Sequence, residues 1–216
     1  MLAAALILAG LFGAPKDTHA PPIAATCPAT PEGAFVGGAT TCPALELSGV
    51  ANATGASLDP AFDVSVPPAE LVRPTPTAGG FLAGYAADGR RLFVLPIAAN
   101  GAFHLYVPLA TAAQQSLARL EVTTAGARAE RVANAPAEAT AEIISLDETK
   151  AIVAWNARAF PSIRVRESPE RNAIAIGSGS STYEQMSVDT RARIVYVEFS
   201  DGVRSTTRAF TIFGRY

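Results

Sequence analysis

The residue types that most often carry chemistry are few in this sequence and lie far apart. Its two histidines, His19 and His104, stand alone, and neither is followed by Glu in the His-Glu-x-x-His pattern of zinc peptidases. Its two cysteines, Cys27 and Cys42, are too few to complete a structural zinc site. We therefore expect no metal site and no cofactor.

Clusters that look like nucleophiles or acids have structural explanations. Residues 177–181, Gly-Ser-Gly-Ser-Ser, have neither a helix behind them nor a histidine nearby, which favours a mobile hairpin loop over a nucleophile elbow. Asp147 and Glu148 are adjacent in the sequence, whereas glycosidase carboxylates face each other across a cleft. Asp59 and Asp63 lack the oxygen-rich spacing of a calcium loop. We therefore predict no catalytic residues and no enzymatic activity.

The two cysteines instead suggest a disulfide. Cys27 and Cys42 lie in one stretch rich in Pro, Gly and Thr, and a bond between them would close a short loop. Such a bond would stabilise a weakly packed segment by about 3 kcal/mol. Two unpaired thiols are the alternative.

The N-terminus resembles an export or anchoring segment. Residues 2–14 form an unbroken apolar run, shorter than the roughly 20 residues that cross a bilayer. No Lys or Arg precedes the run, and Pro21 would follow a cut after Ala20. Two interpretations stay open: a cleaved signal peptide, or a retained membrane tether formed by residues 1–14. Both predict an extracytoplasmic protein, either periplasmic or secreted.

The charge of the chain limits its partners. A formal net charge of -2 gives no electrostatic reason to expect nucleic acid as a partner. The C-terminal part is locally basic, and arginines on alternating strands would share one face. Arg164, Arg166 and Arg193 are the candidates for docking to a protein partner or membrane complex, because guanidinium groups pair well with carboxylates and phosphates. A solvated sheet face is the alternative. The wider set also contains Arg171, Arg191, Arg204 and Arg208.

Short apolar stretches separated by turn signals predict an all-β fold. Residues 62–66 and 163–166 alternate apolar with polar side chains, as strands with one buried face do. Asp88-Gly89 and Asp201-Gly202 each lie between two such stretches and predict tight hairpins. A helical turn is expected at residues 111–116, and Trp155 is expected in a sandwich core.

These signals divide the chain into four parts. Residues 1–20 form the signal-like segment and residues 21–44 an extended linker. Antiparallel β-sandwich modules are predicted at 45–138 and 139–216, with a Pro/Ala/Glu-rich hinge at 134–141.

Both modules resemble the immunoglobulin-like accessory modules found near the C-terminus of secreted bacterial metallopeptidases. In the first module the similar segments are residues 84–90, 103–108 and 117–122, and in the second they are 153–157, 160–166 and 199–205. The resemblance covers roughly residues 60–216 and rests mostly on strand and turn residues. It implies an immunoglobulin-like fold and an extracytoplasmic setting. It transfers no active-site residue, because the catalytic domain of those peptidases has no counterpart in this sequence.

Two functional classes follow from these observations. The first is a non-catalytic structural or accessory protein that docks to a membrane protein complex or a cell-surface partner. The alternative is a secreted domain that binds a carbohydrate or another ligand.

Overall fold

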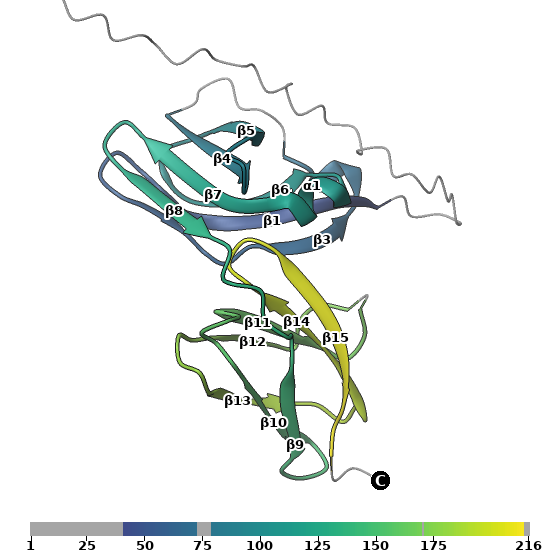
Figure 1. Ribbon diagram of the computed structural model, residues 1–216. Coiled ribbons are helices and arrows are strands. Elements are labelled where there is room, and N and C mark those ends of the chain that lie inside the picture. The colour runs from purple at the N-terminus through teal and green to yellow at the C-terminus, as the bar shows by residue number, and fades with distance from the viewer. Residues whose placement is uncertain (1–40, 73–78, 170, 214–216) are drawn as a thin grey trace, which may run out of the picture.

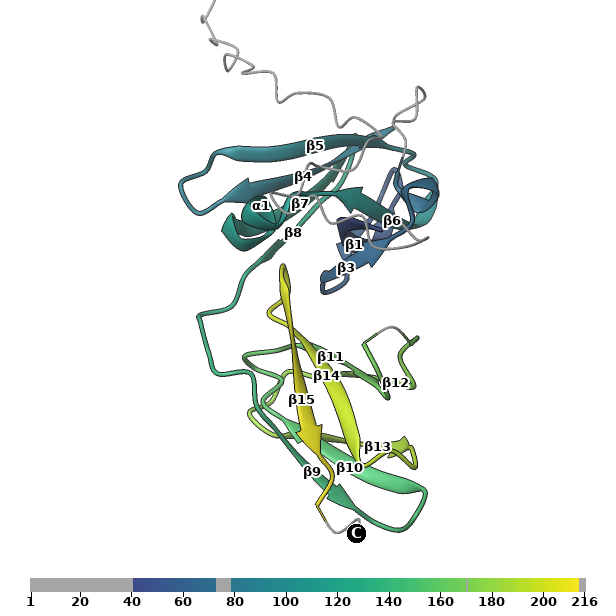
Figure 2. The same ribbon diagram turned by 90° about the vertical axis from the view of Figure 1, so that its right-hand side faces the viewer.

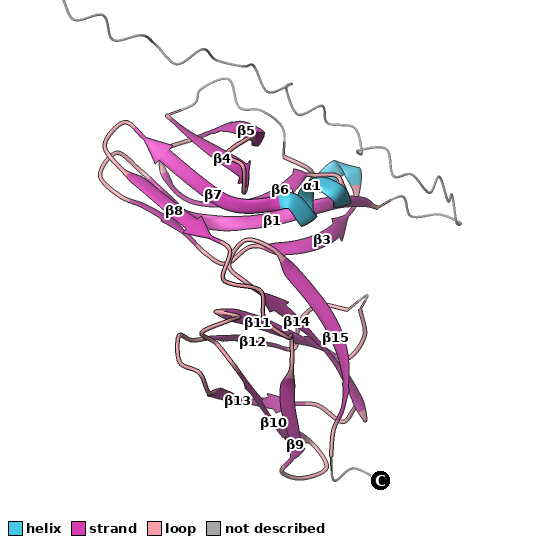
Figure 3. Ribbon diagram, in the orientation of Figure 1, coloured by secondary structure: helices cyan, strands magenta, loops and turns pink. Residues whose placement is uncertain are grey.

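The prediction of an all-β protein built from antiparallel sheets is confirmed by a computed structural model of the chain, which describes residues 41–72, 79–169 and 171–213 (Figures 1 and 3). Fifteen strands in this part of the chain are accompanied by one short α-helix and one 3-10 turn. None of the helices in the described part has the length and apolar character that crossing a membrane requires. The predicted signal-like segment 1–20 lies outside the described residues.

Strands β1 to β8 form two sheets that enclose one core, which we call the N-terminal sheet pair. One sheet places β1 (Cys42–Ala51) between β6 (Gly101–Pro108) on one side and both β2 (Ala56–Leu58) and β3 (Phe62–Val66) on the other. The second has the order β5 (Arg91–Ile97), β4 (Gly80–Ala86), β7 (Leu117–Thr124), β8 (Arg128–Val132). The 3-10 turn η1 (Pro68–Glu70) follows β3, and α1 (Thr111–Ser116) precedes β7 at the predicted position. Leu45, Leu47, Leu82, Phe93 and Leu120 are among the side chains buried between the two sheets.

Strands β9 to β15 form the C-terminal sheet pair. One sheet has the order β13 (Glu184–Asp189), β10 (Lys150–Trp155), β9 (Ala141–Ser145). The facing sheet has the order β12 (Ala175–Ser178), β11 (Ser162–Arg166), β14 (Ile194–Ser200), β15 (Ser205–Thr211). Trp155 lies in the core between them, as predicted, and its indole Nε1 donates to the carbonyl oxygen of Phe160 at 3.1 Å. The two sheet pairs stack end to end, and the end of β15 lies far from the N-terminal pair (Figure 2).

Both predicted Asp-Gly hairpins are present. Gly89 and Gly202 have φ values of 81° and 105°, a conformation that glycine adopts without a steric penalty. In the second hairpin the Asp201 carboxylate accepts hydrogen bonds from the backbone N–H groups of Val203 and Arg204, at 2.9 and 2.8 Å. In the first hairpin the Asp88 carboxylate accepts a hydrogen bond from the Arg90 N–H at 2.9 Å. Such local bonds explain why the dipeptide predicted the turn in both places.

Two local predictions need correction. Strand β1 begins at Cys42, inside the predicted linker 21–44, because Cys42 and Ala44 pack against Val66 and Leu71 in a small core of their own. The predicted mobile loop at 177–181 is also partly wrong, since Gly177 and Ser178 belong to β12. Gly177 is needed there for close packing: a Cβ atom at this position would lie 2.7 Å from the Trp155 ring.

The predicted hinge at 134–141 has no regular secondary structure up to Ala141, where β9 begins, but it is tied to its surroundings. The backbone N–H of Asn134 donates to the carbonyl oxygen of Asp201 at 3.1 Å. Its side-chain amide donates to the carbonyl oxygens of Arg158 and Ala159, both at 2.9 Å. Ala139 is buried in the C-terminal core. The connection therefore holds the two sheet pairs together through specific contacts.

Candidate functional site

The sheet pairs meet where the β14–β15 hairpin reaches the N-terminal pair, a region we call the junction (Figures 1 and 2). Val203, at the tip of this hairpin, is fully buried within the N-terminal core. The backbone N–H of Ala61 donates to the carbonyl oxygen of Gly202 at 3.2 Å, and the Ser200 hydroxyl donates to the carbonyl oxygen of Ala61 at 2.6 Å. One hairpin thus belongs to both cores, which restricts movement between them.

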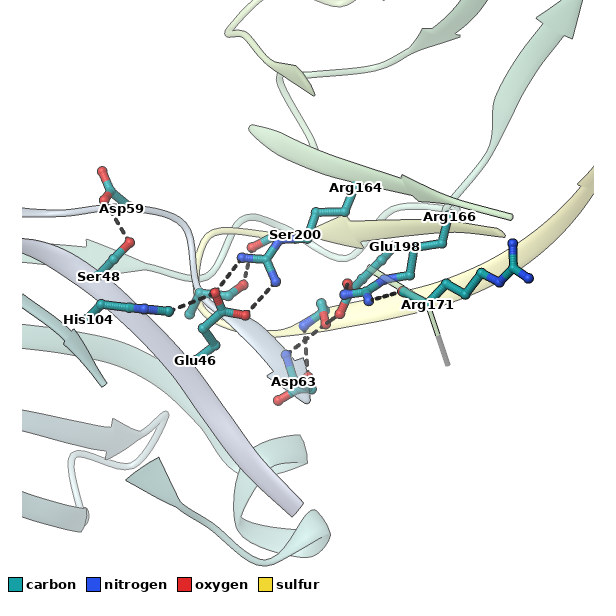
Figure 4. A network of polar contacts seen from close by, with 12 residues as sticks. Glu46, Ser48, Asp59, Asp63, His104, Arg164, Arg166, Arg171, Glu198 and Ser200 are labelled. Atoms are coloured by element: carbon teal, nitrogen blue, oxygen red, sulfur yellow. Dashed lines mark hydrogen bonds and ion pairs between the residues drawn. The ribbon is translucent and has the colours of Figure 1, made fainter. Parts of the chain in front are cut away.

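The first polar cluster of the junction is centred on Glu46 of β1 (Figure 4). Arg164 of β11 donates to both of its carboxylate oxygens, Nη2 to Oε1 at 2.8 Å and Nη1 to Oε2. His104 of β6 contacts the same Oε1 through Nε2 at 3.0 Å. The Arg164 guanidinium also lies 3.7 Å above the centre of the Phe62 ring. The Arg164 guanidinium and the Glu46 carboxylate therefore join the sheet pairs through a bidentate ion pair, and the Phe62 ring covers it.

The second cluster connects Asp63 of β3 to Ser205 of β15 and Glu198 of β14 (Figure 4). Asp63 N–H donates to the Ser205 hydroxyl oxygen at 2.9 Å, and Ser205 N–H donates to Asp63 Oδ2 at 2.8 Å. The same hydroxyl donates to Glu198 Oε1 at 3.0 Å. Arg166 neutralises Glu198 by donating to its Oε2 at 3.2 Å. A chain of hydrogen bonds through these four residues therefore crosses the junction.

Glu46 and Asp63, the two junction carboxylates that belong to the N-terminal sheet pair, have pKa values shifted in opposite directions. Burial opposes ionisation of Glu46, but the hydrogen bonds and charge of Arg164, followed by those of His104, outweigh it and lower the pKa of Glu46. Burial raises the pKa of Asp63 to about 6; the Ser205 N–H opposes this shift, while Glu198 and Asp201 add to it. Glu46 is thus held as an anion, whereas Asp63 favours the protonated form more than an ordinary aspartate does.

The structure separates the three arginines predicted to dock a partner. Arg164 and Arg166 keep only 15% and 19% of their side-chain exposure and form ion pairs within the chain. Arg193 is exposed just before β14. Arg208 of β15 lies opposite the core residue Val197 in the sheet register, so it does not share the outward face of Arg164 and Arg166. The predicted single basic face is therefore not formed.

Sequence reasoning missed the carboxylates that pair with these arginines. Glu46 and Glu198 are lone acids inside otherwise apolar strands, at Leu45-Glu46-Leu47 and Val197-Glu198-Phe199. An acid flanked by apolar residues on a strand can indicate a buried partner of opposite charge, because burying an unpaired charge is very unfavourable. The sequence does not reveal which arginine supplies that charge.

The remaining predicted site residues concern metals and the disulfide. The part of the chain that the structure describes contains no group of three or more His, Cys, Asp or Glu residues arranged to hold a metal ion. Cys42 is fully buried at the start of β1. Its predicted partner Cys27 lies outside the described residues, so the disulfide stays a prediction. The His104 side chain on β6 is half-exposed.

No protein-family model matches this chain, and a search of curated proteins finds no match either.

Proposed function

We propose that the protein is a non-catalytic, extracytoplasmic accessory protein that docks to a membrane protein complex or cell-surface partner through two immunoglobulin-like β-sandwich modules. The observation that carries this proposal is the junction: an ion pair, an aromatic cover and a shared hairpin join the two sheet pairs. The resemblance to accessory modules of secreted metallopeptidases supports the same assignment.

A fixed junction suits a protein that works by binding. Domains joined by a simple linker move relative to one another unless their interface is extensive. Holding both modules in one orientation lowers the entropy lost when a partner contacts the two modules together. The Glu46–Arg164 pair, the Asp63–Ser205 pair and the contacts of Asn134 all serve this purpose here.

The contact surface that we propose lies at the end of the C-terminal sheet pair far from the junction. Phe213 is 72% exposed and forms a bridge with Ile144, which is 46% exposed. Ile144 in turn lies opposite Ile152 in the sheet register. Arg193, the exposed member of the three predicted docking residues, accepts a hydrogen bond from Ile212 through its carbonyl oxygen. Apolar side chains beside an exposed arginine are typical of protein contact surfaces.

Site-specific photocrosslinking in the native host tests this proposal. A photoreactive amino acid at Phe213 or Arg193 is expected to give one discrete crosslinked product in the cell-envelope fraction. The same group at Asp88, in the exposed hairpin of the N-terminal pair, is the matched control and should give none. Recovery of the protein in the cytoplasmic fraction, or equal crosslinking from all three positions, would contradict the proposal.

The alternative, a carbohydrate-binding domain, requires aromatic rings arranged side by side on one surface. The exposed aromatic residues of the described chain are Phe81 on β4, Tyr183 between β12 and β13, and Phe213 after β15. These three side chains come from separate elements in both sheet pairs and provide no shared platform for a sugar ring. We therefore favour the docking role.

A further inference from the structure

A cavity of about 310 Å³ lies at the junction. Its wall combines Asp63 of β3, Gln114 of α1, the connecting residues 135–137, Phe160 after β10, and Phe199 with the hairpin that follows it. Its volume is at the lower end of the roughly 300–1,000 Å³ that small-molecule sites occupy. Because both sheet pairs contribute to the wall, the cavity exists only when the junction is formed.

Two polar side chains in this wall each have an atom without a hydrogen-bond partner. Gln114 is only 7% exposed, yet its amide Nε2 donates to no acceptor in the described chain. Asp63 Oδ1 likewise accepts from no donor there. Both atoms are covered, but the terminal torsions of Asp and Gln are broad, so small rotations can turn them toward a ligand. A ligand that accepts from Gln114 and donates to Asp63 would satisfy both side chains.

The charges around Asp63 favour a cationic donor. Glu198 is paired with Arg166, and Asp201 is paired with Arg204. Within the described residues Asp63 has no ion pair of its own. The charges of Glu198 and Asp201 raise its pKa, and the smaller effect of Arg204, which is paired with Asp201, lowers it. An ammonium group would supply the positive charge that this carboxyl lacks.

One side of the wall is apolar and aromatic, while Gln115 and polar residues of the β14–β15 hairpin, Arg204 among them, line another part. The rings of Phe160 and Phe199 lie edge to face with their centroids 5.3 Å apart, and Ala135, Pro136 and Ala137 complete this side of the cavity. We propose that the cavity binds a small amine that carries a neighbouring oxygen acceptor and a short apolar group. The ammonium pairs with Asp63, the oxygen accepts from Gln114, and the apolar group packs against Phe160 and Phe199. This ligand site does not depend on the docking role.

The probe for this proposal is 2-amino-1-phenylethanol, which combines an ammonium group, a hydroxyl and a ring. Titration into the ¹⁵N-labelled full chain at pH 7.5 should shift the backbone amide signals of Gln115, Ser205 and Thr206 in a saturable manner. A Kd on the order of 1 mM is expected for a molecule of this size. The matched compound 2-phenylethanol, which lacks the ammonium group, should bind about tenfold more weakly.

Substitutions and pH test the assigned contacts. Asp63→Asn is expected to weaken binding about tenfold and Gln114→Leu about fivefold, because each removes one polar contact. The same chemical changes at exposed positions, Asp88→Asn and Gln185→Leu, should leave the affinity unchanged. Lowering the pH from 7.5 to 5 should weaken binding by about tenfold as Asp63 becomes protonated.

Three outcomes would overturn the proposal: equal binding of the amine and the neutral alcohol, unchanged affinity in Asp63→Asn, or shifts confined to amides outside the cavity. A thermal melt of each variant shows whether it is folded. If Asp63→Asn does not fold, the pH dependence and Gln114→Leu decide the question in its place.

Discussion

Replacing Arg164 with methionine tests the central contact of the junction. Methionine keeps an apolar side chain of similar length but removes the guanidinium group that pairs with Glu46. Both partners are largely buried, with 15% and 16% of their side-chain surface exposed. Breaking a fully buried pair by removing one partner costs about 3–5 kcal/mol, because a buried charge loses its compensation.

The expected loss for Arg164→Met is smaller than this, at about 2–3 kcal/mol. His104 still contacts Glu46 Oε1 in the variant and retains part of the compensation, although it is half-exposed. The contact between the guanidinium and the Phe62 ring, worth about 0.5–1 kcal/mol, is lost as well. Arg208→Met is the matched control, because Arg208 is exposed on β15 and its loss should change stability by about 0.5 kcal/mol or less.

Urea denaturation measures the effect. Far-UV circular dichroism reports both sheet pairs, whereas fluorescence of Trp155, the single tryptophan, reports the C-terminal pair. A double-mutant cycle with Glu46→Gln isolates the pairing and should give a coupling energy of about 1 kcal/mol or more. The reasoning is refuted if Arg164→Met is as stable as Arg208→Met, or if the coupling energy is zero.

Three further predictions follow from single residues. The pKa of Asp63 is about 6 in the fold, above its usual 3.8, so the folded state binds the proton more tightly than the unfolded chain does. The stability that comes from this protonated carboxyl is therefore lost as the pH rises through about 6. The total loss is on the order of 3 kcal/mol. Asp63→Asn should therefore lose less stability than the parent chain between pH 4.5 and 7.5 in urea titrations, and an identical pH dependence of the two chains would exclude this role. Gly177→Ala should destabilise the fold by about 1–3 kcal/mol and alter Trp155 fluorescence, because the added Cβ atom meets the tryptophan ring; an unchanged melting temperature would show that the ring moves aside easily. Cys27 and Cys42 should be bonded in the exported protein, so intact mass after alkylation without reductant should show no modified cysteine, and two alkylated residues would disprove the bond.

Local signals accounted for much of the fold. Alternation of apolar and polar residues located strands such as β3 and β11, and Asp-Gly dipeptides located the two hairpins at residues 86–91 and 200–205. These predictions succeeded because strand periodicity and turn conformation depend on neighbouring residues. Residues 177 and 178 were predicted as part of a loop because the Gly-Ser stretch has no helix behind it and no histidine nearby. The requirement for glycine at 177 comes from Trp155 across the sandwich, whose ring a Cβ atom would meet.

The junction depended on the tertiary structure. The arginines at 164 and 166 were visible in the sequence, and their charge suggested a surface for a partner. In the fold they pair with Glu46 and Glu198, and Glu46 is 118 residues distant from Arg164 along the chain. Sequence periodicity indicates on which face of a strand a side chain lies. It does not indicate which other strand packs against that face. The packing of the two sheet pairs therefore decides which charges meet and which of them lose water. It also decides which carboxyl has its pKa raised.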